Sequence, residues 1–165
     1  MTPAPYGVDV LSHSVTLVDV PRPFLDTIST TSQALSVFSL TVTRPARAET
    51  LVLLLDSSRR GVALLSDTSR HAAGSTPSHV GELLGHHVVG MASAHPAAVA
   101  CFVLTVEPDA TPTIDDAEKW FAFADVCDRA GIVLLDWCVR GFATRPGELR
   151  GRGSVWCPKH VAGTA

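Results

Sequence analysis

The sequence predicts a mixed α/β (α+β) fold in which helices flank a central mixed sheet. Two apolar runs, residues 98–106 and 132–139, are too short and too rich in β-branched side chains for ordinary helices, and they fit buried strands. The stretch between them, residues 113–130, carries apolar side chains at helical spacing and is followed by Gly131. Because the second run is apolar on both faces, we expect a strand–helix–strand unit with the second strand central in the sheet.

The helix expected over residues 113–130 has its own start signal and core face. Thr113 can cap it, and Asp115 and Asp116 would lie in the first turn, near the positive end of the helix dipole. The stripe expected to pack on the sheet contains Ala117, Trp120, Phe121, Ala124, Cys127 and Ala130, broadened by Phe123 and Val126.

The first half of the chain predicts a β-hairpin and a second long helix. Residues 49–56 and 62–65 are strand-like and are joined by a polar turn. Ser78 can cap a helix over residues 79–94. Three glycines lower the helix propensity of that segment and indicate close backbone packing: Gly81, Gly85 and Gly90.

The remaining signals are weaker. They are a short helix over residues 24–38, a strand at 40–43, an edge strand within 15–20 and a final strand over 150–156. We expect residues 1–20 and 161–165 to be loosely ordered and residues 1–165 to form one domain.

Composition and charge limit the class of protein. With 165 residues, of which 46% are hydrophobic and 18% charged, the chain can bury a full core and is not of the disordered type. A net charge of −3 gives no general reason to expect nucleic acid or an anionic membrane as partner. The start of the chain lacks a signal-peptide pattern, and no apolar run approaches the roughly 20 residues of a membrane span. We therefore expect a cytoplasmic protein without a membrane partner.

The four cysteines are expected to be buried free thiols in a reducing compartment. They lie within or beside apolar runs, and no two form a CxxC pair. Cys138 with the run Cys157-Pro158-Lys159-His160 matches no common zinc-knuckle spacing. We therefore expect no zinc site there.

Basic residues gather near the C-terminal end of the chain. They are Arg140, Arg145, Arg150, Arg152 and Lys159, and only Glu148 opposes them. This pattern favours solvated surface charges, with a nucleic-acid interface as the weaker alternative.

The order of these elements resembles the JAB/MPN domain, particularly its RadC-like bacterial branch, over residues 49–141. Three pieces carry the resemblance: LLLD at residues 53–56, TPTIDD at 111–116 and AGIVLLDW at 130–137. The family typically has Gly-Ile-x-Leu-Leu-Asp-His where the last piece stands. The resemblance implies a mixed sheet between helices, with cytidine-deaminase-like layering.

The zinc motif of active family members is missing. Those members bind zinc through His-x-His-Pro at a strand end and through Asp in Ser-x-x-Asp, and an upstream Glu handles the zinc-bound water. Here Thr105 and Glu107 stand where the two histidines belong, whereas Asp116 remains, with Thr113 in place of the serine. The segment 107–113 is about two residues shorter than in the family. Glu49 lies near the position of the catalytic Glu, about one residue out of step.

The chemistry of these replacements favours an inactive site. A catalytic zinc needs three protein ligands, usually including imidazole, whereas Glu107 and Asp116 form at most a weak site for a hard cation. Thr113 and Asp116 are also explained as a helix cap. We therefore expect no metal and no cofactor, and a catalytically inactive binding or scaffolding module with a protein partner, including self-association. The alternatives are a metal-dependent hydrolase rebuilt around Glu49, Glu107 and Asp116, and a DNA-associated accessory protein.

Overall fold

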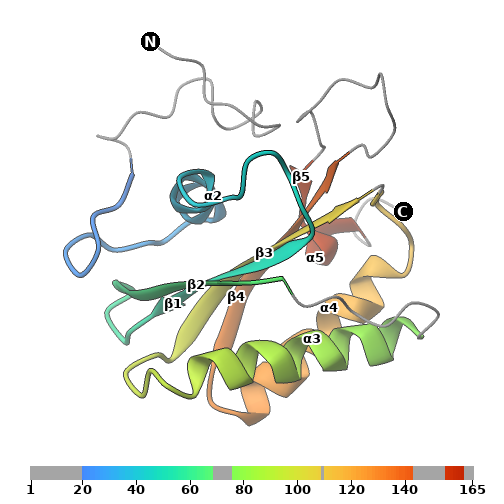
Figure 1. Ribbon diagram of the computed structural model, residues 1–165. Coiled ribbons are helices and arrows are strands. Elements are labelled where there is room, and N and C mark those ends of the chain that lie inside the picture. The colour runs from blue at the N-terminus through green and yellow to red at the C-terminus, as the bar shows by residue number, and fades with distance from the viewer. Residues whose placement is uncertain (1–19, 69–75, 109, 143–154, 162–165) are drawn as a thin grey trace.

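Five strands form one sheet in the order β2-β1-β3-β4-β5 (Figure 1). The computed structural model describes residues 20–68, 76–108, 110–142 and 155–161. Its strands are β1 (Glu49–Leu55), β2 (Gly61–Asp67), β3 (Ala100–Pro108), β4 (Val133–Phe142) and β5 (Val155–Trp156). Its helices are α2 (Thr31–Ser39), α3 (Pro77–Ala92), α4 (Asp116–Arg129) and α5 (Pro158–Val161). The predicted mixed fold with a central mixed sheet is confirmed. Across the described ranges, no helix is both long enough and apolar enough to cross a membrane.

The predicted strand–helix–strand unit is confirmed as β3–α4–β4. β3 and β4 pair in parallel, so that Leu104 lies beside Cys138. On the side of β3 away from β4, β1 pairs antiparallel with β3. β1 also pairs antiparallel with β2, and these two strands form the predicted hairpin. β5 pairs antiparallel with β4 through two residues only. Both strands of the unit therefore have neighbours on each side, which explains their continuous apolar sequence.

The sheet separates two hydrophobic cores (Figure 1). On the face covered by α3 and α4, Phe123 packs with Val103 of β3. On the opposite face, covered by α2, Phe38 packs with Leu53 of β1. We call these the α3/α4 face and the α2 face. Because successive strand residues point to opposite faces, each strand contributes to both cores.

α2 begins later than predicted, at a capping box. The Thr30 hydroxyl accepts from the Gln33 amide at 3.2 Å, and the Gln33 side chain accepts from the Thr30 amide at 3.2 Å. These two bonds satisfy amide groups that the first turn of a helix leaves without intrahelical partners. Residues 40–43, predicted as a strand, form a turn after the helix instead.

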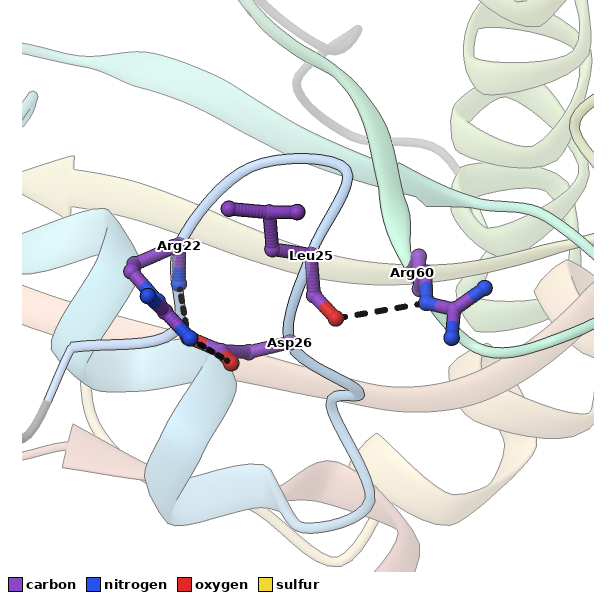
Figure 2. A network of polar contacts seen from close by, with 4 residues as sticks. All are labelled: Arg22, Leu25, Asp26 and Arg60. Carbon is purple, nitrogen blue, oxygen red and sulfur yellow. Dashed lines mark hydrogen bonds and ion pairs between the residues drawn. The ribbon is translucent and has the colours of Figure 1, made fainter.

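The segment before α2 is not helical because it is tied to the start of β2 (Figure 2). Arg22 and Asp26 form an ion pair at 2.9 Å, which closes a turn. The Arg60 guanidinium donates to the Leu25 carbonyl at 3.3 Å, and the Ile28 amide donates to the Arg59 carbonyl at 2.8 Å. The Leu25 and Asp26 amides donate to the Arg22 carbonyl in a local turn, while other backbone groups of the segment bond to residues 59–61.

Two glycines of α3 allow close contact with α4, as their occurrence in the sequence indicated. A Cβ atom at Gly85 would lie 2.7 Å from Cβ of Val126, and one at Gly81 would meet the Lys119 carbonyl. Gly90, in contrast, faces open space. The glycines that lower helix propensity therefore include two that packing requires.

The prediction that Phe121 packs on the sheet is wrong. Phe121 is 68% exposed, whereas Phe123 is fully buried and contacts the Trp137 ring at 5.5 Å between centroids. Trp120 is half-buried at the edge of the α3/α4 core. Phe121 and Phe123 are two positions apart and so point to opposite sides of the helix, and the core uses the side that contains Phe123 and Cys127.

Other boundaries also differ from the prediction. α3 is capped by the Thr76 hydroxyl rather than by Ser78. The described part of the final strand is limited to β5, and Val161, expected in a loose tail, is the last residue of α5. Residues 1–19, which include most of the predicted edge strand, lie outside the described residues, as do 143–154 and 162–165.

Candidate functional site

A cavity of about 550 Å³ lies at the carboxyl ends of β3 and β4, beside the start of α4. Ligands of α/β proteins commonly bind at this edge of parallel strands. The cavity is lined by all five predicted site residues: Glu49, Thr105, Glu107, Thr113 and Asp116. Its wall also contains residues from distant parts of the chain, including Lys119, Trp137 and Trp156.

Thr105 is held inside the wall of this cavity. It is buried on β3, and its hydroxyl accepts a hydrogen bond from the indole nitrogen Nε1 of Trp137 at 3.0 Å. A hydroxyl bound in this way is a neutral, poor metal ligand. Thr105 therefore contributes a structural contact to the cavity wall.

Asp116 is the most heavily hydrogen-bonded group of the site. Its carboxylate, 4% exposed, accepts from the Thr113 amide at 3.1 Å and from the Thr113 hydroxyl at 3.2 Å. It also accepts from Nε1 of Trp156 at 3.0 Å and lies 3.8 Å from Nζ of Lys119. The expected cap is thus reversed, because Asp116 accepts from Thr113 and no side chain caps α4 at Asp115.

Glu107 is the acidic group of the cavity that protein contacts leave available. Among the residues that the structure describes, it makes no hydrogen bond or ion pair. Burial raises its pKa, and the neighbouring Asp116 raises it further, while Lys119 lowers it. Glu107 is therefore the group in this cavity most responsive to a ligand that carries positive charge or a hydrogen-bond donor.

Glu49 does not join the other site residues through its carboxylate, although it reaches the cavity wall. Glu49 lies two positions before Leu51 on β1, so both residues belong to the α2 face of the strand. Its carboxylate oxygens accept from the Thr43 amide and the Thr43 hydroxyl, each at 2.7 Å. Both carboxylate oxygens are therefore used in contacts with Thr43, and Glu49 lines the cavity as a group already bound by the protein.

The donor set does not fit a catalytic zinc site. Of the family's ligand positions, Thr105 carries a bonded hydroxyl, and Asp116 is occupied by protein donors. Glu107 and Asp116 together give two carboxylates and no imidazole. Among the described residues, the one cluster of three potential ligands from His, Cys, Asp and Glu lies elsewhere, at Asp136, Cys138 and Cys157.

The predicted basic surface is wrong at Arg140. This residue is fully buried on the α2 face of β4, where it pairs with Val106 of β3 and Val155 of β5. Its side chain stands on the same face of the sheet as that of Cys138, which is part of the α2 core, and it therefore belongs to the interior. Lys159 is exposed, and its ammonium lies 5.2 Å from the centre of the Trp120 ring. The remaining predicted members, Arg145, Arg150 and Arg152, lie outside the described residues.

Three important residues of the site were not identified from the sequence. Lys119 follows Asp116 by three positions in α4, a spacing that could have predicted their ion pair. Trp137 occupies the place of the final His in the family pattern, which could have marked it. Trp156 comes from the two-residue strand β5, and no local pattern predicts its contact with Asp116.

Comparisons with known proteins do not assign this chain to a family. No protein-family model matches it, and a search of curated proteins finds no match. What is established is a mixed α/β fold with a cavity at the carboxyl ends of two parallel strands. The resemblance to the JAB/MPN domain rests on the sequence pattern alone.

Proposed function

We propose that this protein is a catalytically inactive, RadC-like member of the JAB/MPN family that acts in the cytoplasm as a binding module. The observation that supports this most is how the site's side chains are used. Thr105 and Asp116 each accept a hydrogen bond from a tryptophan of the cavity wall. Groups that would hold a metal or move protons in an active relative are committed here to keeping the cavity in shape.

The chemistry of the cavity favours a basic group as its occupant. Lys119 is already placed against Asp116, whereas Glu107 has no comparable partner among the described residues. An ammonium or guanidinium group beside Glu107 would offset the burial that disfavours its charged form. We propose that a lysine or arginine side chain of a protein partner, which includes a second copy of this chain, enters the cavity.

The test uses small mimics of such side chains. N-acetyl-L-argininamide and N-acetyl-L-lysinamide are titrated into isotopically labelled protein, and amide and indole NMR shifts are followed. We expect saturable shifts at Glu107, Lys119 and the Trp156 indole, with dissociation constants on the order of 1 mM, because one side chain buries little surface. N-acetyl-L-norleucinamide, which lacks the charge, is the matched control ligand.

Two variants determine whether Glu107 is the recognition group. Glu107→Gln removes the charge and is expected to weaken binding several-fold. Asp125→Asn removes an exposed α4 carboxylate that pairs with Arg129 at 2.8 Å outside the cavity, and it should leave binding unchanged. Equal binding by the neutral control ligand, or equal loss in both variants, contradicts the proposal.

One observation favours the alternative, a metal-dependent hydrolase. Glu107 has a raised pKa beside a second carboxylate, an arrangement that is common where a carboxyl group acts as an acid or base. Metal analysis of protein purified without chelator distinguishes the two functions. Near-stoichiometric metal, together with a zinc-dependent rise in melting temperature that Asp116→Asn abolishes, would replace the binding module with the hydrolase.

A further inference from the structure

Two cysteine thiols meet on the α2 face, behind the cavity. Sγ of Cys138 on β4 lies 3.0 Å from Sγ of Cys157, which directly follows β5 and is 19 positions later in the sequence. Cys138 is 3% exposed, whereas Cys157 is half-buried. The carboxylate of Asp136 lies within 4.8 Å of both sulfur atoms.

The pairing of β5 with β4 explains why the thiols meet. Trp156 pairs with Val139 in the antiparallel ladder. Cys157 and Cys138, which are next to them, therefore lie opposite each other on neighbouring segments of the chain. Trp156 lines the cavity on the α3/α4 face, while Cys157 packs against the α2 core. The cysteine pair is thus one residue away from an indole that holds Asp116.

The geometry of this cluster favours a disulfide over a metal site. Two thiolates on a tetrahedral zinc, with Zn–S bonds of about 2.3 Å, stand about 3.8 Å apart, which exceeds the separation seen here. The oxygens of Asp136 already accept from the Thr31 hydroxyl at 2.7 Å and from the Trp137 amide at 2.9 Å. These contacts hold the carboxylate in place as part of the fold.

We propose that Cys138 and Cys157 are the site of a reversible disulfide, formed by a hydroperoxide, that fixes Trp156 in the wall of the cavity. Its effect on ligand binding rests on the proposed function, whereas formation of the bond does not. The disulfide would join β5 covalently to β4, where two residue pairs alone link them in the described structure.

The reaction balances with hydrogen peroxide as the oxidant. The Cys157 thiolate attacks one peroxide oxygen, the S–O bond forms, the O–O bond breaks, and hydroxide leaves to be protonated to water. The Cys138 sulfur then attacks the sulfenic sulfur of Cys157, the S–S bond forms, and the S–O bond breaks. The released hydroxide takes the Cys138 proton as a second water. Two thiols are oxidised by two electrons, and one peroxide is reduced.

The roles of the two thiols follow from their surroundings. The oxidant meets the half-buried Cys157 first, because Cys138 is enclosed by the core. The neighbouring Cys157 thiol and burial both raise the pKa of Cys138, so it stays protonated until its partner has reacted. Cys101 and Cys127 form a second pair of buried thiols on the α3/α4 face, closed to solvent, and serve as an internal control.

The experiment counts thiols in the full-length protein. Reduced protein is treated with hydrogen peroxide, unfolded in N-ethylmaleimide and weighed intact before and after dithiothreitol. We expect two N-ethylmaleimide adducts on the oxidised protein instead of four, with the polypeptide itself lighter by two hydrogen atoms, and four adducts when dithiothreitol treatment precedes alkylation. Peptide mapping should join Cys138 to Cys157. Cys157→Ser and Cys157→Ala should each abolish the cross-link, and either variant serves if the other does not fold.

Three results would overturn the proposal. They are oxygen addition at Cys157 without a cross-link, a cross-link between Cys101 and Cys127 instead, and stoichiometric zinc in the isolated protein that requires Cys138 and Cys157.

Hydrogen exchange then tests the effect on the cavity wall, since the Val155 and Trp156 amides should exchange more slowly after oxidation. The N-acetyl-L-argininamide titration is repeated on oxidised protein, where we expect severalfold tighter binding. A disulfide without any binding would refute the proposed function alone.

Discussion

Replacing Asp116 with alanine should destabilise the protein, because this carboxylate is the hydrogen-bond acceptor for two residues of the cavity wall, Thr113 and Trp156. The substitution leaves the Thr113 amide and the indole N–H of Trp156 without their acceptor. A donor left unsatisfied costs about 1–3 kcal/mol, and partial access of water to Trp156 reduces its share. We therefore expect the free energy of unfolding to fall by about 2–4 kcal/mol. For a chain of this length, that corresponds to a melting temperature lower by roughly 5–15 °C.

Asp116→Asn separates hydrogen bonding from charge. The amide oxygen can still accept from the Thr113 amide and from Trp156, which share one carboxylate oxygen, so a loss of about 1 kcal/mol is expected. Urea denaturation followed by circular dichroism measures both variants, with an unchanged slope as evidence that the same structure unfolds. Asp125→Ala, which removes an exposed ion pair, should cost about 0.5 kcal/mol or less. Equal losses for alanine at positions 116 and 125 would refute the reasoning.

Three further predictions concern the cavity and the packing of α4. The pKa of Glu107 is raised in the folded protein, so the wild type should lose stability as the pH rises above the ordinary pKa of 4.5. Glu107→Gln should remove this loss, and urea denaturation at a series of pH values above 4.5 measures the difference. Gly85→Ala should destabilise by about 1–3 kcal/mol through overpacking, whereas Gly90→Ala, facing open space, should gain about 0.5–1 kcal/mol; a gain in both would contradict the close helix contact. Phe123→Ala should cost about 3–5 kcal/mol and Phe121→Ala much less, and thermal melts that reverse this order would place the wrong side of α4 in the core.

The parts of the fold that could be predicted are those with a strong local pattern. The runs that became β3 and β4 are apolar on both faces, and the Gly131 stop after α4 is unambiguous. The rotation of α4 could not be predicted, because Phe121 and Phe123 extend the apolar pattern to two sides of the helix. Packing against α3 and the sheet decides between them, and that information is not local.

In the candidate site, likewise, the sequence predicted the contacts between residues that are close in the chain and not the distant ones. Thr105, Glu107, Thr113 and Asp116 meet because a strand end and a helix start are adjacent in the chain. The contact of Trp156 with Asp116 joins residues 40 positions apart, through a strand too short to leave a pattern. The face of Glu49 depends on a register difference of one residue, which the sequence leaves open.

β4 contributes side chains to two chemically distinct sites, one on each face of the sheet. Its odd-numbered residues, Trp137 and Val139, belong to the cavity, and its even-numbered ones, Asp136 and Cys138, belong to the thiol pair. Substitutions from Asp136 to Val139 should therefore sort into two sets of phenotypes by odd and even residue number. Before Asp136 a register irregularity reverses the alternation, and Leu134 lies in the α3/α4 core. β4 keeps the side chains of the two sites on opposite faces, whereas the neighbouring residues Trp156 and Cys157 connect the cavity wall to the thiol pair.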